Sequence, residues 1–197
     1  MERAGCLLGA ALRAAILMAA SLAVACPPAP ERPAGAGGDG GTASGRPVPI
    51  PNARVAMDGV LSGGQPSPEQ IAAAAQGGYR TVINVRTESE PGFAWERGAV
   101  ESHGMHYVHI PISGAEDLTR ESVERVDAAL REARDRGPVI LHCGSGNRIG
   151  ALLALRAAWL QGVDPQAALD YGLATGLTGL EPATREILGL EDAPAED

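Results

Sequence analysis

The segment HCGSGNR, residues 142–148, places a cysteine before a run of small residues that closes on an arginine. The apolar segment PVILHC leads into it, and the apolar stretch ALLALRAAWL follows. In such a loop the amide hydrogens of Gly144, Ser145 and Gly146 can turn toward one point, where the dipole of the following helix favours an anion. Asn147 completes the loop, and Arg148 adds a planar cation that can bind two oxygens at once. We therefore predict an anion-binding loop formed by residues 144–148.

Cys143 stands at the base of this loop. The amides, the helix terminus and Arg148 all favour a thiolate over a thiol. A thiolate in an anion site can attack phosphorus and form a cysteinyl phosphate, or attack a sulfane sulfur and form a persulfide. We predict that His142 orients the loop, and the alternative is that its imidazole also stabilises the thiolate. The competing interpretation is a tight turn around a buried, unreactive cysteine, which the two glycines and the closing arginine disfavour.

The sequence resembles the beta-lactamase-hydrolase-like phosphatase family of bacteria, within the protein tyrosine/dual-specificity phosphatase superfamily. The segments LSGGQPSPEQIAAAAQGGYRTVINVRTESE, YVHIPI and HCGSGNRIGALLAL carry the likeness, which spans nearly all of residues 53–180. The resemblance implies that Cys143 is the nucleophile and that Arg148 binds phosphate. It implies a hydrolase that acts on a phosphate monoester through a cysteinyl phosphate.

Two departures from the usual phosphatase pattern keep a second chemistry open. The usual loop has one more residue between its cysteine and arginine than this one, in which residues 144–147 separate them. The residue after the arginine is usually serine or threonine, which helps the thiolate to leave, and here it is Ile149. The shorter loop resembles that of rhodanese sulfurtransferases. The alternative function is therefore sulfur transfer through a Cys143 persulfide, and a non-catalytic anion-binding module is a third.

A phosphatase also needs a general acid to protonate the leaving oxygen. The resemblance implies an aspartate on a loop before the cysteine, and ISGAEDLT offers Glu116 and Asp117. We predict that Asp117 is the acid. The alternative is a solvated carboxylate close to the N-terminus of the next helix. His106 and His109 are three residues apart on a predicted strand and so face opposite sides. We predict no metal site and no cofactor.

Strands and helices alternate along residues 53–197, which predicts an α/β domain of three layers, with a mainly parallel sheet and helices on both faces. In such sheets ligands bind where strands lead into helices, as at residues 142–148. We predict strands at Val60–Gly64, Thr81–Val85, Met105–Ile112 and Pro138–Cys143. We predict helices that start at Pro68 and Arg120, capped by Ser67 and Thr119. Further helices are predicted at Phe93–Ser102, Ile149–Gln161, Pro165–Thr175 and Pro182–Leu188.

The first residues predict export. Residues 1–25 have the basic start, apolar middle and small residues of a signal peptide, and LAVAC resembles a lipobox in which Cys26 is lipidated. The alternative is an ordinary signal peptide cleaved near Ala25. Residues 26–52 are rich in proline and glycine, which predicts a linker. We therefore expect a domain anchored by lipid in the bacterial cell envelope.

The composition limits the classes of partner that the chain can bind. The chain has a formal net charge of −8 and contains no lysine, which argues against nucleic-acid binding. Of its cysteines, only Cys143 lies in the predicted domain, so the domain has no internal disulfide. The expected partners are a phosphorylated or sulfur-donor substrate and, through the lipid, a membrane.

Overall fold

The computed structural model describes residues 45, 46 and 48–190. The predicted signal peptide, the predicted lipidation site Cys26 and most of the predicted linker lie outside the described residues, as do residues 191–197 of the predicted domain. These predictions therefore remain predictions.

The domain is organised around a five-stranded sheet with the order β1-β2-β5-β3-β4. Strand β1 pairs with β2 in antiparallel fashion, whereas the other neighbouring strands are parallel. The mainly parallel sheet predicted from the alternation of strands and helices is thus confirmed. The strands are β1 (Arg54–Met57), β2 (Val60–Gly63), β3 (Thr81–Asn84), β4 (His106–His109) and β5 (Val139–His142).

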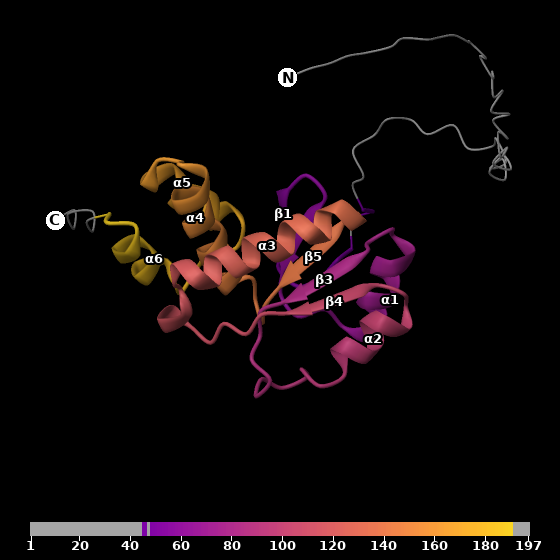
Figure 1. Cartoon of the computed structure of the whole chain (residues 1–197). Helices are drawn as coiled ribbons and strands as arrows, with labels where there is room; N and C mark the ends of the chain where they lie inside the picture. Colours follow the sequence, from indigo (N-terminus) through magenta and orange to yellow (C-terminus); the bar gives the residue numbers. More distant parts are fainter. Residues whose placement is uncertain (1–44, 47, 191–197) are drawn as a thin grey trace, which may run out of the picture. The chain divides into compact units, whose positions relative to one another are not determined.

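Helices cover both faces of the sheet, as predicted (Figure 1). Successive residues of a strand point to opposite faces, so Ile140 packs with the α1 and α2 side while Val139 and Leu141 pack with the α3 and α4 side. The helices are α1 (Pro68–Gln76), α2 (Glu96–Ser102), α3 (Arg120–Arg136), α4 (Asn147–Gln161), α5 (Pro165–Ala174) and α6 (Glu181–Ile187). A short 3₁₀ helix, η1 (Ala115–Asp117), precedes α3.

The predicted caps of two helices are confirmed. The Ser67 side chain accepts a hydrogen bond from Gln70 N–H, and the Gln70 side chain bonds back to the backbone of Ser67, which is the full capping box. Thr119 accepts from Ser122 N–H at the start of α3. These bonds satisfy amides that have no partner inside the helix.

Two features at the N-terminal side of the domain differ from the sequence-based prediction. Strand β1 was not predicted, because its sequence RVAM shows no alternation of apolar and polar residues. Its one branched apolar residue, Val55, is exposed in the structure. Val48 and Ile50, which fall in the predicted linker, are buried in the core on the α1 and α2 side. The folded domain therefore begins before residue 53, because these two side chains remove apolar surface from water.

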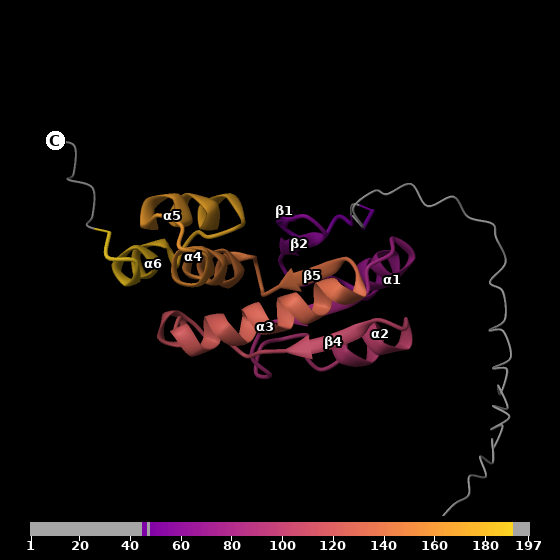
Figure 2. The same ribbon diagram turned by 45° about the horizontal axis from the view of Figure 1, so that its top comes forward.

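The carboxyl ends of the parallel strands all lie at one edge of the sheet. Figure 2 shows α4, α5 and α6 grouped at this end of the domain and α1 and α2 at the other. The segments that leave β2, β3, β4 and β5 therefore emerge side by side. Within residues 48–190, no helix has the length and apolarity that crossing a membrane would require.

Candidate active site

The loop that carries the predicted nucleophile connects β5 to α4. Strand β5 ends at His142, and α4 begins at Asn147, two residues earlier than predicted. Gly146 has a φ of 99°, in the left-handed region that glycine adopts without strain. This turn directs the Gly146 N–H to the Sγ of Cys143, which accepts it at 3.0 Å. Cys143 itself is buried, so a thiolate formed here has a backbone donor in place of water.

Neighbouring segments hold the backbone of this loop. The Gln65 N–H donates to the Gly144 carbonyl at 3.2 Å, and the Asn52 side chain donates to the Ser145 carbonyl at 3.0 Å. The Cys143 N–H donates to the Gly63 carbonyl. The backbone of the loop is therefore fixed by hydrogen bonds that do not use the Cys143 sulfur.

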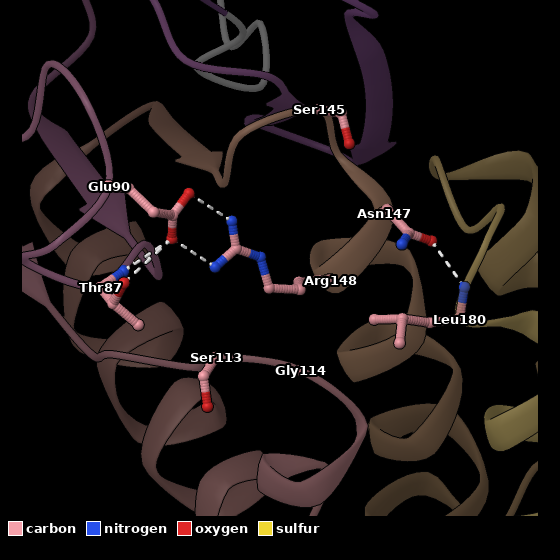
Figure 3. A pocket seen from close by; sticks show the side chains of 8 residues that line it. All are labelled: Thr87, Glu90, Ser113, Gly114, Ser145, Asn147, Arg148 and Leu180. Carbon is pink, nitrogen blue, oxygen red and sulfur yellow. Dashed lines mark hydrogen bonds and ion pairs between the residues drawn. The ribbon is translucent and has the colours of Figure 1, made fainter.

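Arg148 is held by two segments distant in the sequence. Its Nη1 and Nη2 donate to the two carboxylate oxygens of Glu90 at 2.6 and 2.8 Å, and its Nη1 also donates to the Ile112 carbonyl at 2.7 Å. Figure 3 shows the two side chains facing each other, with dashed lines marking the bonds between them. The bond to Glu90 is the largest cause that raises the pKa of Arg148. Arg148 is therefore a permanent, oriented cation beside the Cys143 loop.

Glu90 is a carboxylate stabilised in its ionised form. Arg148 is the largest cause, and the Thr87 N–H and Arg86 also donate to it, so the pKa of Glu90 falls to about 2. The carboxylate is thus charged at neutral pH. A bidentate arginine–carboxylate pair also fixes the plane of the guanidinium, so Glu90 determines how Arg148 presents itself to a bound anion.

Arg148 lies in an open cavity of about 400 Å³. Asn147 and Ser145, two further predicted binding residues, also line it, whereas Gly144 and Gly146 do not. The side-chain oxygen of Asn147 accepts hydrogen bonds from the N–H groups of Thr178 and Leu180, at 2.8 and 3.1 Å. Figure 3 shows the second of these bonds. Asn147 therefore holds the segment before α6 at the rim of the pocket. The complete lining is Thr87, Glu90, Ser113, Gly114, Ser145, Asn147, Arg148 and Leu180.

His142 is fully buried behind the loop. Its Nδ1 lies 3.2 Å from the Cys143 carbonyl, which is consistent with the predicted orienting role. Its Nε2 lies 2.8 Å from the Glu96 carboxylate but forms no hydrogen bond with it. Glu96 is also fully buried, and the side chains of Gln65 and Asn84 donate to it.

Asp117, the predicted general acid, is the last residue of η1 and is exposed. It accepts hydrogen bonds from the hydroxyl and the N–H of Ser113, at 2.5 and 2.7 Å, and these bonds lower the pKa of Asp117. Ser113 lines the pocket and Asp117 does not. The structure therefore places the predicted acid at the pocket rim, bonded to a lining residue.

The sequence analysis did not identify Glu90, Arg86 or Gln65 as site residues. Gln65 follows β2, and Arg86 and Glu90 follow β3, on the two sides of β5 in the sheet. These residues could have been suspected because polar side chains that directly follow buried parallel strands gather at one edge of the sheet. To know which of them meet, however, the order of the strands in the sheet is required, and the sequence alone does not give it. Among the described residues, no group of three histidine, cysteine, aspartate or glutamate side chains is placed to hold a metal ion.

Much of the chain resembles known bacterial protein sequences. A family model described as "Beta-lactamase hydrolase-like protein, phosphatase-like domain" matches residues 54–159. The Beta-lactamase hydrolase-like protein of Xylella fastidiosa (strain Temecula1 / ATCC 700964) is 33% identical over 96 residues, which are 47% of this chain and 22% of that protein. The matched segment therefore spans less than a quarter of the length of this relative.

Solved structures share the fold. A crystal structure described as a putative phosphatase from Shewanella putrefaciens CN-32 aligns with a TM-score of 0.56 at 23% identity, over 71% of this chain and 87% of that chain. A crystal structure of TpbA from P. aeruginosa in complex with phosphotyrosine aligns with a TM-score of 0.53 at 20% identity, over 68% of this chain and 80% of that chain. At these identities the likeness establishes the arrangement of helices and strands.

Proposed function

Because the chain belongs to the family described as Beta-lactamase hydrolase-like protein, phosphatase-like domain, we propose that it hydrolyses phosphate monoesters with Cys143 as the nucleophile. One observation carries the proposal. The Cys143 sulfur and the Gly146 amide that donates to it lie on the short loop between β5 and α4, and the oriented Arg148 guanidinium comes from the first turn of α4 and lines an open pocket.

In the first step the Sγ of Cys143 attacks phosphorus and the bond to the ester oxygen breaks. The phosphoryl group is then bonded to sulfur, and the alcohol leaves with a proton. Arg148 binds oxygens of the transferring group, where negative charge is spread in the transition state. In the second step water attacks phosphorus, the bond to sulfur breaks, and inorganic phosphate and the thiolate result. The atoms balance without a cofactor.

Asp117 is the proposed proton donor of the first step. Its bonds to Ser113 favour the carboxylate, and a carboxylate has no proton to give. Donation therefore requires that these bonds break, or that the negative charge of a bound phosphate raises the pKa of Asp117. In either case its contribution depends on the leaving group, because only a basic leaving oxygen needs the proton.

Ile149 bears on the second step. It is buried and has no hydroxyl, at the position where the family resemblance leads one to expect serine or threonine. A thiolate leaves more slowly without a hydroxyl to assist it. We therefore infer that loss of sulfur from phosphorus is the slow step, and that the cysteinyl phosphate accumulates during turnover.

Phosphotyrosine is the substrate to test first, because it is the ligand of TpbA, one of the similar structures. The wild-type domain should release inorganic phosphate from phosphotyrosine and from an activated aryl phosphate. Cys143→Ser should abolish release, and Arg148→Lys should reduce it strongly, because a point charge cannot replace the guanidinium fork. A domain that releases no phosphate but transfers sulfur from thiosulfate to cyanide would replace this proposal with the sulfurtransferase.

We also propose that the domain is exported and anchored by a lipid on Cys26. The support is the LAVAC segment after an apolar stretch, followed by a proline- and glycine-rich linker. Cys26→Ser should move the protein from the membrane fraction to the soluble or unprocessed fraction. A wild-type protein that fractionates as soluble and carries no lipid by mass would contradict the anchor.

A further inference from the structure

Arg86 is a buried cation next to the proposed site, and the mechanism above does not use it. Its side chain is 6% exposed. Its guanidinium reaches in three directions: Nε donates to Glu90 at 3.1 Å, Nη2 to the Pro91 carbonyl at 2.6 Å, and Nη1 to the side-chain oxygen of Gln65. Burying a charge is costly unless it is paired and hydrogen-bonded, so this degree of pairing identifies Arg86 as the centre of a network.

The network continues on both sides of Arg86. On one side Gln65 donates to the fully buried carboxylate of Glu96 at 3.1 Å. On the other side Glu90 accepts from Arg86 with the oxygen that also accepts from the Nη2 of Arg148. A continuous path of side chains therefore runs from helix α2 through Gln65, Arg86 and Glu90 to Arg148. Charged groups alternate in sign along it.

The backbone of Arg86 is fixed as well. Its N–H donates to the Asn84 side chain at 2.7 Å, and its carbonyl lies 2.7 Å from the Nε2 of His109. Glu90, in contrast, lies on a turn whose residues Glu88 and Ser89 are exposed. An exposed turn cannot by itself hold a carboxylate in one orientation, so Glu90 depends on the side chains that contact it. Arg86 is the one that links it to the buried part of the sheet.

We propose that Arg86 is a positioning residue for phosphate recognition, which keeps Glu90 in the orientation that presents the guanidinium of Arg148 to a bound anion. The proposal rests on the proposed phosphatase function only for the identity of the anion. Lysine can replace Arg86 only in part, because it keeps the positive charge but cannot donate to Glu90, Gln65 and Pro91 in a fixed geometry.

The test is the affinity of the purified domain for inorganic phosphate, measured by calorimetry without turnover, together with unfolding in urea. Arg86→Gln should weaken phosphate binding about tenfold, the loss expected when a charged group gives up its hydrogen bonds. Arg86→Lys should weaken it less.

The matched control is Arg156→Gln. Arg156, on α4, is also a largely buried arginine paired with a carboxylate, because its Nε donates to Asp127 of α3 at 2.7 Å. This control should lose stability and keep the affinity for phosphate.

Two comparisons separate a positioning role for Arg86 from a merely structural one: the double variant with Glu90→Gln and the Arg156→Gln control. In a Glu90→Gln background, Arg86→Gln should have little further effect on phosphate affinity, because Arg86 acts through Glu90. The proposal is overturned if Arg86→Gln binds phosphate like the wild type, or if Arg156→Gln weakens binding equally. If Arg86→Gln does not fold, the phosphate affinity of Arg86→Lys is compared with those of the wild type and Arg156→Gln, and an affinity equal to that of the wild type overturns the proposal. A wild type that binds phosphate but hydrolyses no ester would refute the proposed function and leave this inference testable.

Discussion

Glu90 and Arg148 form a bidentate ion pair in the lining of the pocket, with donor–acceptor distances of 2.6 and 2.8 Å. The two residues are far apart in the sequence and come from the segments after β3 and β5, which are adjacent strands. The pair gives the proposed anion site a fixed cation, and it makes the site dependent on a carboxylate that must remain ionised.

The first prediction concerns acid. The pKa of Glu90 is lowered in the folded protein from 4.5 to about 2 by Arg148 and its other partners. The folded state therefore gains stability from the ionised carboxylate above pH 4.5, and this gain is lost as the pH falls toward 2. Urea unfolding from about pH 6 down to about pH 3 should show the loss in the wild type.

Glu90→Gln should remove that part of the pH dependence, because the amide does not titrate. Glu101→Gln is the control, since Glu101 forms an exposed ion pair with Arg97 on α2, and such pairs contribute little. Equal acid sensitivity in the wild type and Glu90→Gln would show that the ion pair does not stabilise the fold.

A second prediction concerns Asp117. If Asp117 protonates the leaving oxygen, Asp117→Asn should lower kcat/KM for an alkyl phosphate by about 10²–10⁴-fold. The kcat/KM for an activated aryl phosphate, whose leaving group is already stable as an anion, should change far less. The measurement is kcat/KM on both substrates with the same enzyme preparation, because this ratio reports the first step even when the second step is slow. An equal loss on both substrates, or no loss on either, would remove Asp117 from the mechanism.

A third prediction concerns the packing that supports the loop. A Cβ at Gly150 of α4 would lie 2.1 Å from the Leu177 backbone nitrogen and 2.7 Å from the Gly172 carbonyl oxygen. Gly150→Ala should therefore destabilise the domain by about 3 kcal/mol, the upper part of the usual range for overpacking. The free energy of unfolding in urea measures it.

Gly98→Ala is the matched control within α2, where a Cβ would have no atom within 4 Å. Alanine favours a helix over glycine, so this variant should gain up to about 1 kcal/mol. A Gly150→Ala variant as stable as the wild type would mean that α4 and α5 can separate without cost.

The sequence predicted the centre of the site because that part is local. Cys143 lies on the loop after β5 and Arg148 in the first turn of α4, so a buried strand followed directly by a helix is enough to place them. The caps of α1 and α3 were predictable for the same reason. The residues that complete the site are not local: Glu90 meets Arg148 only because β3 lies beside β5, and strand order cannot be read from alternation alone.

Other differences have equally physical causes. The sequence of β1 shows no alternation of apolar and polar residues. A strand of four residues at the edge of a sheet needs little apolar surface to pair with its neighbour β2. Val48 and Ile50 were assigned to the linker by composition, since prolines surround them. Their burial depends on a surface formed by Leu61 and Tyr79 with other residues of that core, which no local pattern reveals.

The most direct test of the central claim is the mass of the Cys143 peptide after turnover is quenched with acid. The wild-type domain, mixed briefly with an aryl phosphate and digested, should yield this peptide carrying one phosphoryl group. Cys143→Ser treated in the same way should carry none. If phosphate is released while the Cys143 peptide stays unmodified, or if the peptide gains only a sulfur atom from thiosulfate, the cysteinyl-phosphate account is contradicted.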